Sequence, residues 1–189
     1  DSDEHYDLLS AYQKSMRGSD PDAAVYYLAR ILAAGDLPSA CRRLMVCASE
    51  DVGLAYPQII PIVKAAVDIA LAVGLPEAQI PLADAVILVA LSPKSNSGCM
   101  AIEQAFSDIE LGRVYPIPRN LQNKHFDGAD AEVKGQHYIY PHNYPDHYTY
   151  QQYLPDEIKN KVYYSPCNNK TERAFNDYHN KITRKENKK

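Results

Sequence analysis

Apolar residues recur every three or four positions through the first 112 residues, which is typical of amphipathic helices. The stretches with this spacing are residues 5–16, 21–34, 38–52, 57–73, 76–91 and 97–111. They are separated by Gly, Pro or Ser-Pro, and these residues commonly mark where helices begin and end. The short connections are typical of helices that pack as antiparallel neighbours. The pattern therefore predicts an all-α fold, a helical bundle.

Three of these helices are distinguished by their apolar faces. The helix over residues 38–52 is expected to turn Cys41, Leu44, Met45, Ala48 and Val52 inward. The stretch of residues 82–91 is apolar nearly all round, so we expect its helix to be the central buried one. The helix over residues 57–73 also has apolar residues on more than one face, and a unit of this size can enclose few such helices completely.

The sequence changes character near Gly112. The first 112 residues carry 7 Lys/Arg and 15 Asp/Glu, while the rest carry 13 Lys/Arg and 9 Asp/Glu. The second part holds 10 of the 15 Tyr, and prolines interrupt it at positions 116, 118, 141, 145, 155 and 166. We expect a domain over residues 1–112 and a Tyr/Pro/His-rich extension over residues 113–189 that packs on it and ends in a helix over residues 169–185.

The composition argues against a nucleic-acid coat, a membrane-spanning protein and a disulfide-bonded protein. The net charge of −4 does not favour a general nucleic-acid coat. The longest apolar stretch, residues 80–91, contains Asp84 and is too short to span a bilayer. The four Cys form no Cys-x-x-Cys pair, which favours reduced thiols and a cytoplasmic protein. The absence of Met at position 1 is expected for a piece of a longer chain.

The sequence lacks the common catalytic motifs. It has no Gly-x-x-x-x-Gly-Lys-Ser/Thr loop for phosphates, no Gly-x-Ser-x-Gly and no His-Glu-x-x-His. His137, His142 and His147 recur every five residues beside Asp146, a spacing that fits no common zinc pattern. We therefore predict that the chain is not an enzyme and holds no cofactor or metal, although a small metal-dependent enzyme remains a remote alternative.

Polar residues gather at three joints between the predicted helices. Such residues could form a surface for a partner or another domain, or they could satisfy helix ends, as Asp20 would by capping the helix that follows. The candidate residues are Arg17, Asp20, Glu50, Asp51, Lys94, Ser95 and Asn96. For self-assembly, the candidate contact residues are Ile59 and Ile62, because their helix carries surplus apolar surface.

Several segments, taken in order, resemble the C-terminal region of the RarA/MgsA family of replication-associated AAA+ ATPases, which includes the Werner-helicase-interacting protein. They are HYDLLSA from residue 5, KSMRGSDPDAA from residue 14, YLAR from residue 27, ASEDVGLA from residue 48, LSPKSN from residue 91, YIYPHNYP from residue 138, QYLP from residue 152 and YYSP from residue 163. Together they cover nearly the whole chain.

The resemblance implies a helical domain like the collar of clamp loaders, which joins the protein into a homotetramer. It further implies a DNA-dependent ATPase that acts in recombination and repair at stalled replication forks, in contact with DNA and single-strand DNA-binding protein. The ATPase core, with its ATP and Mg²⁺, would lie upstream of this chain. An alternative is that this region docks DNA or single-strand DNA-binding protein through Arg113, Arg119, Lys124 and the basic tail.

Overall fold

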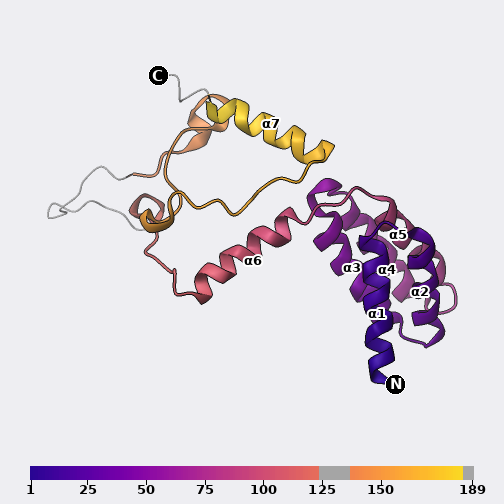
Figure 1. The fold of residues 1–189 in the computed structure, drawn as a ribbon. Helices are drawn as coiled ribbons and strands as arrows, with labels where there is room; N and C mark the ends of the chain where they lie inside the picture. The colour runs from indigo at the N-terminus through magenta and orange to yellow at the C-terminus, as the bar shows by residue number, and fades with distance from the viewer. Residues whose placement is uncertain (124–136, 185–189) are drawn as a thin grey trace. The chain divides into compact units, whose positions relative to one another are not determined.

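The computed structural model describes residues 1–123 and 137–184. Within these ranges the regular structure is entirely helical, which confirms the predicted all-α fold (Figure 1). The α-helices are α1 (Ser2–Arg17), α2 (Pro21–Ala33), α3 (Leu37–Cys47), α4 (Ile59–Val73), α5 (Gln79–Leu91), α6 (Ser97–Glu110) and α7 (Lys170–Arg184).

The chain divides into two units that are not contiguous in sequence. Unit 1 comprises residues 1–101 and 164–173, and unit 2 comprises residues 102–163 together with residues 174 onward. Unit 1 therefore takes in α1 to α5 and also a short segment from the second half of the sequence. The predicted division at residue 112 stays a prediction.

Aspartates begin three of the helices in unit 1. The Asp20 carboxylate accepts a hydrogen bond from the Ala23 amide at 2.9 Å, and Pro21 follows as the first residue of α2. Asp36 does the same for α3, through the Ser39 amide. The cap of α1 is Asp1, which accepts from the Asp3 amide. Each cap satisfies an amide that the helix itself leaves free.

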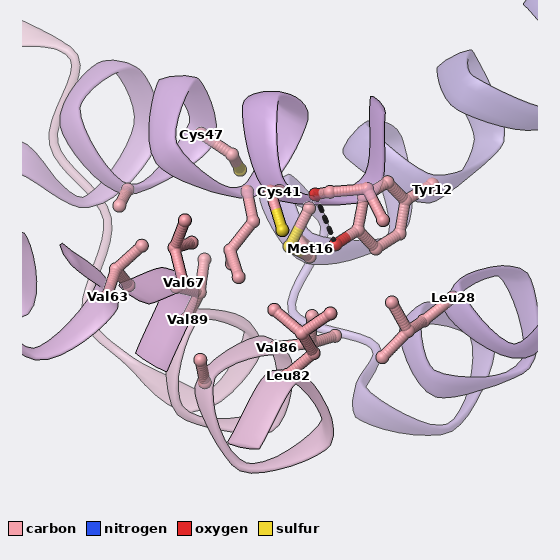
Figure 2. Close-up of a cluster of buried hydrophobic side chains, with 14 of the residues drawn as sticks. Tyr12, Met16, Leu28, Cys41, Cys47, Val63, Val67, Leu82, Val86 and Val89 are labelled. Atoms are coloured by element: carbon pink, nitrogen blue, oxygen red, sulfur yellow. Dashed lines mark hydrogen bonds between the residues drawn. The ribbon is translucent and has the colours of Figure 1, made fainter. Parts of the chain in front are cut away.

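The core of unit 1 is built around α5, as its apolar sequence predicted. This helix contacts α1, α2, α3 and α4, and it buries Leu82, Val86 and Val89 among them (Figure 2). Tyr12 is also fully buried, and its hydroxyl donates a hydrogen bond to the Ala40 carbonyl at 3.1 Å. This bond offsets the cost of burying a hydroxyl and links α1 to α3.

Some predicted core positions lie at the surface. Met45 and Leu91 are 38% and 66% exposed. Leu91 is the last residue of α5. Met45 adjoins the buried Leu44 in α3 and lies at the edge of the face that buries Cys41, Leu44 and Cys47.

The regular α-helix of this region ends at Cys47. Residues Ala48–Val52 form a π-helical turn, and a 3-10 turn at Gly53–Ala55 follows. A π turn holds more residues than an α turn, so the side chains after it are rotated about the axis. Asp51 lies in this turn and is buried, at 6% exposure.

Between α6 and α7, the described residues contain only short 3-10 turns, as the frequent prolines predicted. These turns are Arg119–Leu121, Pro141–Asn143, Pro145–His147 and Asp156–Ile158. The Gln151 side chain takes the place of a neighbouring strand: it accepts from the Ile139 amide at 3.2 Å and donates to the Ile139 carbonyl at 2.8 Å. In the part of the chain that the structure describes, no helix is long and apolar enough to cross a membrane.

Candidate functional site

The three polar joints meet in unit 1. Arg17 ends α1, the π turn carries Glu50 and Asp51, and the connection between α5 and α6 carries Lys94 and its neighbours. Two of these joints are in direct contact, because the Ser95 amide donates a hydrogen bond to the Asp51 carbonyl at 2.8 Å. The candidate residues that the sequence scattered over 80 positions therefore form one cluster, which we call the joint cluster: Arg17, Glu50, Asp51, Lys94, Ser95 and Asn96.

An ion pair lies at the centre of the joint cluster. The Arg17 Nε donates to the buried Asp51 carboxylate at 2.8 Å, and one of its terminal nitrogens lies 3.7 Å from Glu50. The hydrogen bond to Asp51 raises the pKa of Arg17 above its ordinary value. The Cys47 thiol donates to the other Asp51 oxygen at 3.1 Å, and burial followed by this bond raises the pKa of the thiol. Cys47 is thus a protonated donor at neutral pH and not a nucleophile.

Lys94 links the end of α5 to the connection between α1 and α2. Its Nζ donates to the Ala90 and Ser92 carbonyls, at 2.9 and 2.6 Å, where α5 leaves its last carbonyls free. It also donates to the Ser19 hydroxyl at 3.0 Å, between α1 and α2. Burial lowers the pKa of Lys94 below its ordinary value. All three donors of the ammonium group are used within the chain.

A carboxylate that the sequence analysis did not single out completes this region. Glu172 is 1% exposed, and its oxygens accept from Tyr164 Oη at 2.8 Å, Asn169 Nδ2 at 2.8 Å and the Cys167 amide at 3.3 Å. Burial raises its pKa, but hydrogen bonds from Ser95 and other neighbours outweigh that effect, so the pKa of Glu172 is lowered. Glu172 thus links residues 164–173 to the connection that holds Ser95.

Nothing local in the sequence marks Glu172 as buried. It lies in the first turn of α7, a helix whose polar residues are typical of a solvated surface. Its polar partners come from residues 95–97 and 164–169, and the first of these groups is more than 70 positions away. A spacing argument cannot find such a residue. The preceding Asn169, whose side chain accepts from the Glu172 amide at 2.9 Å, was the available signal, because Asn favours helix starts.

The remaining candidates are placed apart from the joint cluster. The Asp20 carboxylate serves as a helix cap. Ile59 is fully buried in the core of unit 1, whereas Ile62, on the same helix, is 38% exposed. Of these two candidates for self-assembly, only Ile62 is therefore accessible to a second chain in this conformation.

The basic residues expected to dock DNA are only partly described. Arg113 donates to Asp108 at 2.8 Å, and Lys161 and Tyr163 contact the same carboxylate. Hydrogen bonds from Tyr163, Arg113 and Lys161 lower the pKa of Asp108 despite its desolvation. The charge of Arg113 is thus used within unit 2, while Lys124 and the end of the basic tail lie outside the described residues.

The geometry favours a structural role for these polar groups. The joint cluster and Glu172 are satisfied by internal contacts, and no buried side-chain nitrogen or oxygen in the described ranges lacks a partner. His142 and His147 face each other, with their Nδ1 atoms 2.7 Å apart, but the described residues contain no group of three side chains suited to a metal. The sequence contains no Gly-x-x-x-x-Gly-Lys-Ser/Thr loop, the motif that cradles the phosphates of ATP in P-loop ATPases.

The chain is similar in sequence to several known proteins. The chain is 51% identical to Replication-associated recombination protein A of Bacillus subtilis over 98% of its own length, which is 44% of that protein. It is 39% identical to the Escherichia coli protein of the same name, over 88% of this chain and 38% of that one. It is 34% identical to ATPase WRNIP1 of Dictyostelium discoideum, over 86% of this chain and 19% of that protein.

The chain thus spans less than half the length of these relatives. Residues 18–183 match the family model described as MgsA AAA+ ATPase C terminal, which covers the helical part and the Tyr-rich part together. On this match, and on the identity shared with the Bacillus subtilis protein, the chain belongs to the family of C-terminal regions of MgsA AAA+ ATPases.

Proposed function

We propose that this chain is the region through which a replication-associated, DNA-dependent AAA+ ATPase assembles into a homotetramer. The names of the similar proteins support replication-associated recombination as the setting. Repair at stalled replication forks is part of the proposal. The ATP and Mg²⁺ sites of the whole protein would lie outside this chain, since its sequence has no phosphate-binding loop. The whole protein would act at the replication fork together with DNA and single-strand DNA-binding protein.

One observation carries the proposal for self-assembly, an exposed apolar stripe on α4. The stripe consists of Ile62, Ala65, Ile69, Ala72 and Val73, which are spaced three and four residues apart and lie on one side of the helix. Its large members, Ile62, Ile69 and Val73, are 38%, 52% and 50% exposed. This spacing is typical of the seam between two packed helices, and an unpartnered seam is a place where a second copy can bind.

The charged residues of α4 border the stripe without interrupting it. Asp68 lies beside Ala65 and Ala72, and it forms an ion pair with Lys64 at 2.6 Å. A contact through the stripe would therefore be apolar, although unit 1 contains most of the acidic half of the sequence. Apolar contacts persist at high salt, whereas contacts with phosphate weaken steeply as salt rises. Salt dependence thus separates assembly from the alternative role in docking DNA.

The test is light scattering coupled to size-exclusion chromatography, applied to the full 189-residue chain at several concentrations in low and high salt. We expect the mass of four chains in both salts. Ile69→Asp should lower the mass, because a carboxylate would be buried in the contact. Leu71→Asp is the matched control: Leu71 is 56% exposed on the same helix but lies outside the stripe. A wild-type chain that runs as a monomer at micromolar concentration in both salts contradicts the proposal.

A further inference from the structure

A small hollow lies between α1 and α3 in unit 1, away from the joint cluster. Its volume is about 310 Å³. On α1 it is lined by Ser2, His5 and Tyr6, and on α3 by Ser39, Arg42 and Arg43. In each helix these residues are three and four positions apart, so they share one face. Two helix faces thus converge on a space with two guanidinium groups.

Within the described residues, the two arginines in this hollow have no acidic partner. Among the first 112 residues there are four Arg and 15 Asp/Glu. Arg17 pairs with Asp51 at 2.8 Å and Arg30 with Glu4 at 3.5 Å. In the described part of the chain, by contrast, neither Arg42 nor Arg43 forms an ion pair or a hydrogen bond. Two adjacent cations that remain unpaired in a strongly acidic half are available for an anion from outside.

The carboxylate that contacts two residues of the lining, Asp36, is already engaged. Asp36 accepts from the Ser39 amide at 3.2 Å and lies 2.8 Å from the His5 Nε2. The hydrogen bonds from Ser39, followed by the contact with His5, lower the pKa of Asp36 despite its partial burial. Its charge is therefore offset by His5 and by the start of α3 instead of by the arginines.

The size and chemistry of the hollow define its ligand. Guanidinium groups bind phosphate and carboxylate oxygens in pairs, and Ser2 in the lining adds a hydroxyl donor beside them. The volume of the hollow is at the lower end of the range for small-molecule sites. It therefore suits a small ligand, such as a phosphate group with one ring attached. The Tyr6 ring forms one wall and is 67% exposed, so it offers a face on which a base can stack.

We propose that Arg42 and Arg43 bind the phosphate monoester of a nucleoside, with its base against Tyr6. A monoester carries nearly two negative charges at neutral pH, which match two guanidinium groups better than the single charge of an internal phosphodiester. The same group occurs in a free nucleotide and at the 5′ end of a DNA strand. This site is independent of the α4 stripe and of the proposed assembly.

The experiment measures binding to the full chain by fluorescence anisotropy, with a short oligothymidylate that carries either a 5′-phosphate or a 5′-hydroxyl and a label at its 3′ end. We expect the 5′-phosphorylated strand to bind about tenfold more tightly, since hydrogen bonds to charged groups contribute on this scale. Titration calorimetry with thymidine monophosphate and with inorganic phosphate then separates the sources. Preference for the strand over the free nucleotide assigns the site to DNA ends, and equal affinity assigns it to nucleotides.

Variants test the residues. The double change Arg42→Ala with Arg43→Ala should abolish the preference for the 5′-phosphate, while Arg30→Ala, which removes an arginine from α2, should keep it. Circular dichroism establishes that each variant is folded. Tyr6→Ala should weaken binding of thymidine monophosphate several-fold and leave inorganic phosphate unchanged, because only the former has a base to stack.

Three results would overturn the inference. The first is equal binding of the two strands by the wild-type chain, and the second is an unchanged preference in the double variant. The third is a phosphoserine peptide that binds as tightly as thymidine monophosphate, since the ligand would then be a phosphorylated protein. Light scattering on the same variants reports assembly separately, so failure of this inference and failure of the proposed assembly are distinguishable.

Discussion

At the scale of single residues, Asp51 is the buried charge on which the joint cluster depends. Its partners are Arg17, at 2.8 Å, and the Cys47 thiol, and both come from other parts of the local structure. Removal of one partner of a buried pair is costly because the other charge remains desolvated. The joint at the end of α1 and the π turn are thus linked by an interaction between residues 34 positions apart.

Arg17→Ala is expected to lower the free energy of unfolding by about 2 kcal/mol, a value reduced from that of a fully buried pair because Arg17 is half-exposed. Arg30→Ala is the control, since the pair of Arg30 with Glu4 lies at the surface and contributes less than about 1 kcal/mol. Urea unfolding of both variants measures the difference. If both variants lost the same free energy of unfolding, the burial of Asp51 would add nothing to the stabilisation by its ion pair with Arg17.

Asp20→Ala is expected to lower the free energy of unfolding by about 1 kcal/mol, because the Ala23 amide would lose its acceptor. Asp22 lies in the first turn of the same helix without that bond, so Asp22→Ala should cost only a few tenths of a kcal/mol. Thermal unfolding compares the two. The capping argument fails if both variants lose the same stability.

Glu172 makes the stability of unit 1 depend on pH. Its pKa is lower in the folded chain than its ordinary value of 4.5, so the folded state favours the ionised form. The resulting stabilisation is present above pH 4.5 and is lost as pH falls through the folded pKa. Urea unfolding at a series of pH values should show a smaller loss of stability toward low pH in Glu172→Gln than in the wild type. The exposed Glu77, changed to Gln, is the control and should leave the slope unchanged.

At the scale of secondary-structure elements, the sharp bend after the π turn depends on Gly53. This residue has φ +46°, and a Cβ at this position would lie 3.2 Å from the Ser95 carbonyl oxygen. Gly53→Ala is therefore expected to lower the free energy of unfolding by about 2 kcal/mol, from backbone strain and close contact. Gly98, in α6, has open space around it, so Gly98→Ala should be neutral or stabilising by up to about 1 kcal/mol. Urea unfolding distinguishes these opposite effects.

The elements that local chemistry determines were predictable from sequence. Asp20-Pro21 began α2 as expected, and Gly74 followed the last residue of α4. The π turn was not predictable, because Ala48 and Val52 continue the apolar spacing of α3 and give no sign of a wider turn. What favours that turn is the pairing of Asp51 with Arg17, a tertiary contact outside any local window.

In the candidate site, too, local features were predictable from the sequence and contacts between distant residues were not. The sequence identified the polar residues of the three joints, since charged and hydroxyl side chains beside Gly and Pro are conspicuous. It could not show that Lys94 reaches Ser19, 75 positions away, or that Glu172 is buried. Spacing along one helix reports which residues share a face, but it does not report which faces meet.

At the scale of the whole molecule, unit 1 is completed by residues that follow unit 2 in sequence. Residues 164–173 belong to unit 1, and their Glu172 accepts hydrogen bonds from the connection before α6. A chain that ends at Tyr163 is therefore expected to lower the melting temperature of unit 1 by several degrees, because Ser95 and Ser97 lose a buried acceptor. A chain that ends at Arg184 is the control and should melt like the full chain. Calorimetry that finds no difference between the two would contradict this role.

The return of residues 164–173 to unit 1 also means that this unit is not held together by chain connectivity alone. A single proteolytic cut between residues 113 and 163 would produce two fragments, and each would contribute part of unit 1. The hydrogen bonds of Glu172 and its neighbours do not require the peptide bonds of unit 2. The two fragments should therefore stay associated after cleavage, and separately expressed fragments should reassemble, as in a split protein.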